Sequence, residues 1–158
     1  MSILEGYTLC IIEHSNDEYS IHGLWQEPWD KHQRDFKHYP LEESTLRSIL
    51  NELHQKWYSG RRNTSHPDLN FWRHEFDHHG AIIEHVKENG QLKEDELDYF
   101  STVLDLFDQA VRKGSSFIES FERHSTPYGT EFRIPLDKDM HFIRLKILSS
   151  VHMKQSTN

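Results

Sequence analysis

Residues 71 to 80 of the chain read Phe71-Trp72-Arg73-His74-Glu75-Phe76-Asp77-His78-His79-Gly80. The pattern predicts a helix over about Leu69 to His79, with Gly80 in the position of a left-handed cap. On such a helix His74 lies one turn before His78, and Glu75 lies one turn before His79, so these ionisable side chains share one contiguous face. This stretch is the densest concentration of chemically active groups in the chain and is therefore the candidate functional site.

A second informative segment lies upstream and reads Tyr19-Ser20-Ile21-His22-Gly23-Leu24-Trp25. It predicts a short strand interrupted by a glycine. Residues Tyr7 to Glu13 carry apolar side chains on both faces of an extended segment, which predicts a largely buried strand. The polar stretch from His14 to Glu18 is expected to form the turn between the two strands.

The rest of the chain divides into helices, strands and loops without an internal repeat or linker. The predicted elements are an irregular connection over 26–40, an amphipathic helix over about 43–58, a loop over 60–67, a core helix over about 95–112 that stops at Gly114, a short helix over Ser115–His124, a turn at Thr126–Gly129 and a strand over Phe142–Ile147. We therefore expect one α+β domain over residues 1–153, followed by a loose tail at 154–158.

Composition excludes several classes of protein. The chain has 158 residues, and no stretch approaches the roughly 18 apolar residues that a membrane helix needs. Its single cysteine, Cys10, cannot form an internal disulfide or a cysteine-based zinc site. The net charge of −8 at pH 7 argues against nucleic-acid binding by a general basic surface, although protonation of the 13 histidines in acid would reverse its sign.

One interpretation of the first segment is a zinc hydrolase, because residues 74 to 78 match the His-Glu-x-x-His pattern of zinc proteases. In that reading His74 and His78 bind the metal and Glu75 acts as the base. A third ligand would be needed, for which Glu84 or His85 are available. The longer form of the motif fails, because the glycine lies at position 80 and Ala81 occupies the required position.

Taken together, the two segments resemble the two active-site blocks of the ribonuclease T2 family, which read roughly I-H-G-L-W-P and F-W-x-H-E-W-x-K-H-G. The opening strand, the helix carrying Tyr99 and Phe100, and the late amphipathic strand follow in the family's order. The resemblance implies an α+β, ribonuclease T2-like fold with a mainly antiparallel central sheet flanked by helices. It places His22 on a strand that faces the helix over 74–79.

The resemblance also implies an activity, the metal-independent cleavage of single-stranded RNA through a 2′,3′-cyclic phosphate to 3′-phosphate ends. It implies no cofactor, and DNA is not a substrate because it lacks the 2′-hydroxyl nucleophile. The resemblance implies an acid–base pair, with His79 as the base and His22 as the acid of the first step. It implies that His74 binds the phosphate and that Glu75 stabilises charge on the phosphorane, and it includes His78 of the second block among the catalytic residues. The implied substrate-binding residues are Trp25, on which a base stacks, Glu27 and Trp72. Trp72 is equally suited to the core.

The chain departs from the family pattern at several positions. His78 replaces a lysine, and since histidine is charged mainly below about pH 6.5, we expect an acid-shifted enzyme. Gln26 replaces a proline and Phe76 a tryptophan, while the family's disulfides cannot form. The absent disulfides and the absence of a signal-peptide pattern favour the cytoplasm somewhat, although a leader removed earlier would look the same, so the compartment stays open. The losses also leave open a catalytically weak T2 fold that binds RNA or protein.

Overall fold

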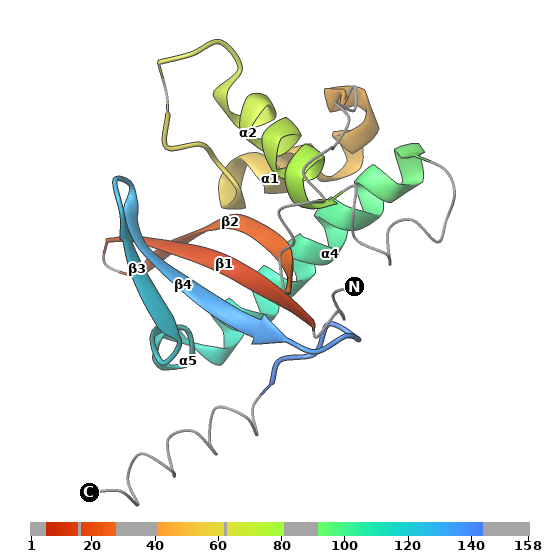
Figure 1. The fold of residues 1–158 in the computed structure, drawn as a ribbon. Helices are drawn as coiled ribbons and strands as arrows, with labels where there is room; N and C mark the ends of the chain where they lie inside the picture. Colours follow the sequence, from red (N-terminus) through yellow and green to blue (C-terminus); the bar gives the residue numbers. More distant parts are fainter. Residues whose placement is uncertain (1–5, 16, 28–40, 62, 81–91, 144–158) are drawn as a thin grey trace, which may run out of the picture.

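The computed structural model describes residues 6–15, 17–27, 41–61, 63–80 and 92–143. Four strands and several helices form the described part of the chain (Figure 1). In chain order the elements are β1 (Gly6–Ser15), β2 (Glu18–Glu27), the 3₁₀ helix η2 (Glu43–Ile49), α1 (Leu50–Lys56), α2 (Pro67–Glu75), the π-helical turn η3 (Phe76–Gly80), α4 (Leu92–Lys113), α5 (Ser115–Glu119), β3 (Glu122–Thr126) and β4 (Gly129–Leu136).

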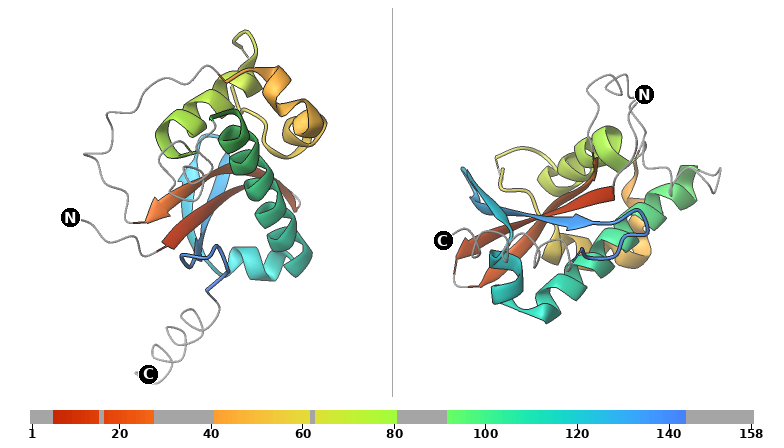
Figure 2. Two further views of the ribbon diagram at one scale, coloured as in Figure 1. Left: turned by 90° about the vertical axis from the view of Figure 1, so that its right-hand side faces the viewer. Right: turned by 60° about the horizontal axis from the view of Figure 1, so that its bottom comes forward.

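The strands form one antiparallel sheet in the order β2-β1-β4-β3. The central strand β1 is buried over most of its length, as its apolar residues on both faces predict. Helix α4 packs against β1 and β2 and runs along one face of the sheet (Figure 2). The turn η3 and the helix α1 contact the edge strand β2 and also contact α4, and α2 lies next to η3 (Figure 1). The α+β class and the central antiparallel sheet are thus confirmed.

The core lies between the sheet and α4. Leu9, Ile11 and Ile21 point from the sheet into it, and Phe100 and Val103 point from α4. All five side chains are fully buried, so this layer holds β1, β2 and α4 in fixed positions. Cys10 projects from the opposite face of β1 and is a free, buried cysteine.

The hairpin at the far edge of the sheet corrects the expectation of a helix over Ser115–His124. The helix α5 ends at Glu119, and residues from Glu122 onward form strand β3, which the predicted turn Thr126–Gly129 connects to β4. Strand β4 was not predicted at all. The alternation of Phe132, Ile134 and Leu136 with polar residues is typical of a half-buried strand. Pro135 interrupts this pattern, and a proline within a segment counts against the prediction of a strand.

The helices before the site also differ in detail from their predicted forms. The single amphipathic helix expected over about 43–58 is divided into η2 and α1, because Ile49 leaves the helical region with φ −121° and ψ 7°. The next helix begins at Pro67, whose fixed φ suits a first helical position. It remains α-helical only to Glu75, and its last turn is the π-helical η3.

Several predictions lie outside the described residues. These are most of the connection over 26–40, the segment with Ala81, Glu84 and His85, the strand beyond Ile143 and the tail at 154–158. Of the late strand, Phe142 is described and forms an isolated bridge with Leu136. Among the described residues, no helix is long and apolar enough to cross a membrane.

Candidate active site

His22 reaches the site because of an irregularity in strand β2. In the pairing of β1 with β2, Cys10 lies opposite Gly23 and Ile11 lies opposite Ile21, which leaves His22 as the extra residue of a β-bulge. Bulges of this kind re-aim a side chain next to a functional site. The His22 side chain, 29% exposed, therefore contacts groups from both β4 and α2.

The helix α2 approaches β2 at a glycine. A Cβ atom at Gly23 would overlap the carboxylate of Glu75 and lie 2.9 Å from Trp25 Nε1. Because glycine leaves this space open, Glu75 Oε1 accepts a hydrogen bond of 3.1 Å from Trp25 Nε1. The other oxygen, Oε2, lies 3.7 Å from His22 Nε2, which confirms that His22 faces the helix carrying residues 74–79.

Two carboxylates flank the His22 imidazole. Glu131 Oε2 lies 2.5 Å from Nδ1, and Glu75 lies on the Nε2 side. Burial alone would lower the pKa of His22, but the hydrogen bond to Glu131 and the charges of both carboxylates outweigh burial and raise this pKa above its usual value. These contacts therefore favour the charged form of His22.

The carboxyl of Glu75 is itself strongly perturbed. It is buried, and burial raises its pKa to about 7, against the opposing effects of His22 and of the hydrogen bond from Trp25. Glu131 behaves differently, although burial disfavours its charge too. The hydrogen bond and charge of His22, together with Arg133, lower the pKa of Glu131 below its usual value. Near neutral pH, one carboxyl is thus charged and the other takes up a proton readily.

His79 belongs to the same cluster through Trp25. The indole ring of Trp25 stacks on the His79 ring with centroids 5.1 Å apart and meets the His22 ring edge-on, also at 5.1 Å. Burial, followed by the charges of His78, His22 and His74, lowers the pKa of His79 to about 3. His79 is therefore neutral above about pH 3, whereas the surroundings of His22 favour its charged form.

His74 and His78 lie at the solvent side of α2 and η3. Their ring centroids are 4.0 Å apart, and His78 Nδ1 is hydrogen-bonded to the His74 carbonyl oxygen at 2.8 Å. Their positions one turn apart on one face are as the sequence predicts. Burial and the charges of His78 and His22 lower the pKa of His74.

A pocket of about 530 Å³ opens beside this cluster. His22, His74 and Glu75 form one wall. The rest of the lining comes from the β1–β2 hairpin, the loop before α2, α2 itself and the β3–β4 turn, through Ile12, His14, Ser20, Tyr58, Ser59, Gly60, Arg61, Thr64, Pro67, Asn70, Phe71, Thr126, Pro127 and Tyr128. The pocket thus combines charged and imidazole groups with aromatic side chains.

None of the three residues predicted to bind substrate, Trp25, Glu27 and Trp72, is among the residues that line the pocket. The expectation for Trp72 is wrong, because its side chain is wholly buried and its Nε1 donates a hydrogen bond of 2.6 Å to the Trp57 carbonyl oxygen. Trp72 is a core residue. Glu27 is exposed at the end of β2, where Oε1 accepts a hydrogen bond of 2.9 Å from Thr8, and it is not among the residues that line the pocket.

Glu131 and Arg133 are the site residues that the sequence interpretation missed. Both lie on β4, with Arg133 Nε donating a hydrogen bond of 3.0 Å to Glu131 Oε1. The guanidinium of Arg133 also lies over the Trp25 ring, 5.6 Å from its centroid. Their signal in the sequence was the alternation of two charged residues with Phe132 and Ile134, which marks one polar and one buried face.

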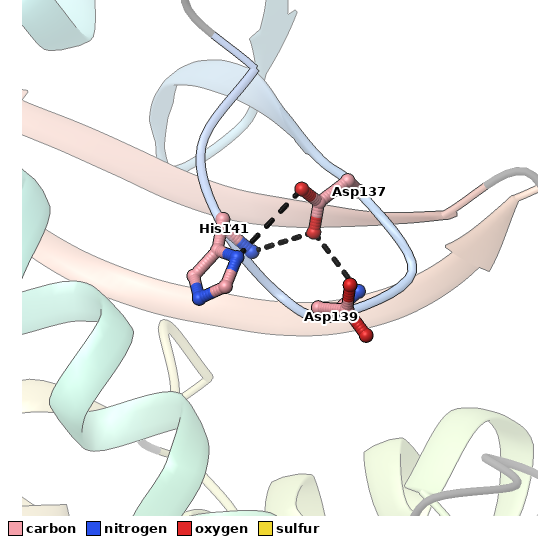
Figure 3. Close-up of side chains that lie close together, drawn as sticks. All are labelled: Asp137, Asp139 and His141. Carbon is pink, nitrogen blue, oxygen red and sulfur yellow. Dashed lines mark hydrogen bonds and ion pairs between the residues drawn. The ribbon is translucent and has the colours of Figure 1, made fainter.

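A separate cluster of Asp137, Asp139 and His141 lies in the turn after β4 (Figure 3). Asp137 Oδ1 accepts hydrogen bonds of 2.9 Å from the backbone N–H groups of both Asp139 and His141. Asp139 and His141 are exposed, and these bonds account for the shape of the turn.

The geometry defines an α+β protein with a cluster of histidine and carboxylate side chains on one face of an antiparallel sheet. The model of the ribonuclease T2 family matches residues 5–121. The chain belongs to this family.

Curated relatives agree with this assignment. The chain is 29% identical over 96 residues to ribonuclease T2 of Sus scrofa, covering 60% of this chain and 44% of that protein. It is 31% identical over 106 residues to ribonuclease T2 protein rnst-2 of Caenorhabditis elegans, covering 63% and 34%, and 30% identical over 103 residues to ribonuclease M of Aspergillus phoenicis, covering 58% and 43%. The matches thus span less than half the length of these relatives.

Solved structures share the fold. Ribonuclease MC1 from the seeds of bitter gourd superposes with a TM-score of 0.57 at 14% identity, covering 87% of this chain and 92% of that one. A mutant of ribonuclease MC1 in complex with 5′-GMP superposes with a TM-score of 0.59 at 15% identity, covering 89% and 92%.

Proposed function

We propose that this protein is an endoribonuclease that cleaves single-stranded RNA by metal-independent acid–base transesterification. The observation that carries the proposal is the pair of imidazoles that contact the Trp25 ring, because the pKa of His22 is raised by its two carboxylates despite burial, while burial lowers the pKa of His79 to about 3. Titratable groups whose surroundings push their pKa values apart mark the acid and the base of a reaction. Membership of the ribonuclease T2 family supports the same activity.

In the first step, His79 accepts the proton of the 2′-hydroxyl as its oxygen attacks the adjacent phosphorus. His22 donates its proton to the departing 5′-oxygen, and the products are a 2′,3′-cyclic phosphate and a 5′-hydroxyl. In the second step the roles reverse, since water attacks the cyclic phosphate and leaves a 3′-phosphate. The base requires a pH above about 3, and the acid requires a pH below the raised pKa of His22. Together these limits support activity from about pH 3 up to the raised pKa of His22.

Charge on the phosphorane would be stabilised by groups at the pocket wall. Glu75, with a pKa of about 7, carries a proton in acid and can donate it in a hydrogen bond to a phosphoryl oxygen. His74 lines the same wall and is exposed, so it can contact a phosphate in the pocket. His78, whose ring lies 4.0 Å from that of His74, takes the position of the family lysine.

The pocket beside the cluster is suited to a nucleotide unit. Phe71, Tyr58 and Tyr128 offer aromatic surfaces, and Arg61 adds a cation. Aromatic faces bind any unstacked base, which favours a single-stranded substrate. The related ribonuclease MC1 structure in complex with 5′-GMP supports nucleotide binding by this fold.

The zinc-hydrolase alternative receives less support from the contacts of Glu75. In that mechanism the glutamate must act as the base beside a metal held by His74 and His78. The Glu75 carboxylate is instead bonded to Trp25 Nε1 and lies 3.7 Å from His22 Nε2. Both contacts direct it toward β2.

The test is cleavage of a labelled single-stranded RNA from pH 4 to 8 with excess EDTA, comparing the chain with its His22→Ala and His79→Ala variants. We expect EDTA-resistant cleavage to a cyclic phosphate, and a loss of at least about 100-fold in either variant. His141→Ala is the matched control, because His141 is 77% exposed and lies in the turn after β4. The 2′-deoxy version of the same oligonucleotide should remain intact.

Three results would overturn the proposal. Absence of cleavage at every pH would leave a T2 fold that binds RNA or protein without cutting it. Peptide hydrolysis restored by zinc would identify residues 74–78 as a metal site. Full activity in both alanine variants would assign the chemistry to other groups.

A further inference from the structure

The buried carboxylate of Glu131 is not part of either active-site block, yet it makes the shortest contact of His22 given above. Both of its oxygens are engaged, Oε2 at 2.5 Å from His22 Nδ1 and Oε1 by the hydrogen bond of 3.0 Å from Arg133 Nε. Its side chain is 3% exposed. A carboxylate fixed at both oxygens is a rigid acceptor for one ring nitrogen of an imidazole.

We propose that Glu131, held by Arg133, is a positioning residue that keeps a proton on His22 Nδ1, so that Nε2 is presented to the leaving oxygen. The catalytic part of this inference rests on the proposed function. The coupling between Glu131 and His22 does not, because it is a property of the folded protein.

The backbone places Glu131 in this role. In the sheet Ile12 lies opposite both Glu131 on β4 and Ser20 on β2, so β1 lies between the two strands that carry the pair. The bulge at His22 turns its ring toward Glu131 across this strand. Arg133 lies two residues further along the same face of β4, opposite Cys10, and holds the free oxygen of Glu131.

The proton on Nδ1 decides which atom can react. When Nδ1–H donates to Glu131, Nε2 is left on the side of Glu75, 3.7 Å from Oε2, and His22 lines the pocket together with Glu75. An imidazole in this orientation delivers a proton only from Nε2. Glu131 therefore acts through His22 and needs no contact with RNA.

The charges around His22 act in opposite directions. The titratable and charged groups that interact with it are Glu131 and Arg133 from β4, Glu75 and His74 from α2, and His79 from η3. Glu131 and Glu75 raise the pKa of His22, while Arg133 lowers it. Removal of Glu131 and removal of Arg133 must then move the titration of His22 in opposite directions.

The kinetic experiment is the pH profile of kcat/KM on the RNA for Glu131→Gln and Arg133→Gln. Deprotonation of the acid sets the basic limb. We expect this limb to move to lower pH by about one unit or more in Glu131→Gln, because an adjacent carboxylate shifts a partner by that amount, and to higher pH in Arg133→Gln. In Glu131→Asp, which keeps the negative charge, the basic limb of the kcat/KM profile should lie at a pH closer to that of the wild type. Glu122→Gln is the matched control, since Glu122 lies opposite Arg133 on β3 with its side chain 70% exposed.

A pH titration of ¹⁵N-histidine-labelled protein, followed by NMR, measures the coupling between Glu131 and His22 in the absence of RNA. The His22 signals should report a proton on Nδ1 and a midpoint that falls in Glu131→Gln and rises in Arg133→Gln. Inactive wild type with these opposite shifts would refute the proposed function and support the Glu131–His22 coupling. Shifts of the same sign in both variants, or a His22 midpoint unchanged in Glu131→Gln, would overturn the inference even in a fully active enzyme.

Discussion

Among single residues, Gly23 illustrates how a position without a side chain can control chemistry. The carboxylate of Glu75 and the Trp25 indole occupy the space that a Cβ would fill. Any larger residue must displace the hydrogen bond between them, and with it the surroundings of His22. The constraint at this glycine is therefore steric and comes from the neighbouring helix.

Gly23→Ala is expected to lower cleavage of RNA by roughly 100-fold, because a displacement of about 1 Å at a catalytic group costs that much. Its measurement is kcat/KM together with urea unfolding. Gly114→Ala is the matched control, since nothing lies within 4 Å of its Cβ but its φ of +99° disfavours alanine. It should cost about 1 kcal/mol of stability and leave the activity per folded molecule unchanged. Equal activity in the two variants would contradict this account of Gly23.

At the scale of elements, the packing of α2 against the loop after α1 fixes the position of the site residues on α2. The hydrogen bond from Trp72 Nε1 ties α2 to the Trp57 carbonyl, and Asp68 receives a hydrogen bond of 2.8 Å from the backbone N–H of Ser59. Asp68 also lies 2.7 Å from His54 Nδ1 of α1. These contacts hold α2, and therefore His74 and Glu75, against the rest of the molecule.

Trp72→Phe should lower the free energy of unfolding by about 2 to 3 kcal/mol, because it removes a buried hydrogen bond and leaves a cavity. It should leave KM for RNA unchanged. Trp25→Phe makes the same substitution within the cluster, where it removes the hydrogen bond to Glu75, and should lower kcat/KM instead. Urea unfolding and steady-state kinetics on both variants decide the matter. A raised KM in Trp72→Phe would support the original prediction that Trp72 binds substrate.

The sequence predicted the elements that carry strong local patterns. The strands around Leu9 and Leu24, the helix of Phe100 and the histidine face of α2 follow from periodicity, and their residues pack as expected. The bulge at His22 was not predicted, because it depends on the register of β2 against β1, which is set between strands. Glu131 was missed for a similar reason, since only pairing of β4 with β1 brings it to His22.

For the molecule as a whole, burial of Glu75 links stability to pH. Its pKa is about 7 in the folded protein, above the ordinary value of 4.5. Between these values the folded chain keeps the proton that the unfolded chain has lost, so this group makes the free energy of unfolding fall as pH rises. His79 acts in the opposite direction between about pH 3 and 6.5, since its pKa is lowered on folding.

Glu75→Gln isolates the first effect. Relative to this variant, wild type should lose about 3 kcal/mol of stability between pH 4.5 and 7.5, as expected for a group whose pKa is raised from 4.5 to about 7. Urea unfolding of both proteins at intervals across that range measures the difference. A difference that stays constant with pH would show that Glu75 does not hold its proton in the folded state.

The partnership of His22 with Glu131 joins positions 109 residues apart in the chain. Chains emerge from the ribosome from the N-terminus, so both imidazoles are synthesised well before β4 exists. Until the β3–β4 hairpin docks on β1, His22 has no carboxylate at Nδ1. If the protein cleaves RNA as proposed, the contact that orients its acid forms only after β4 has been translated and has docked on β1, which protects the message from the chain segments made before it.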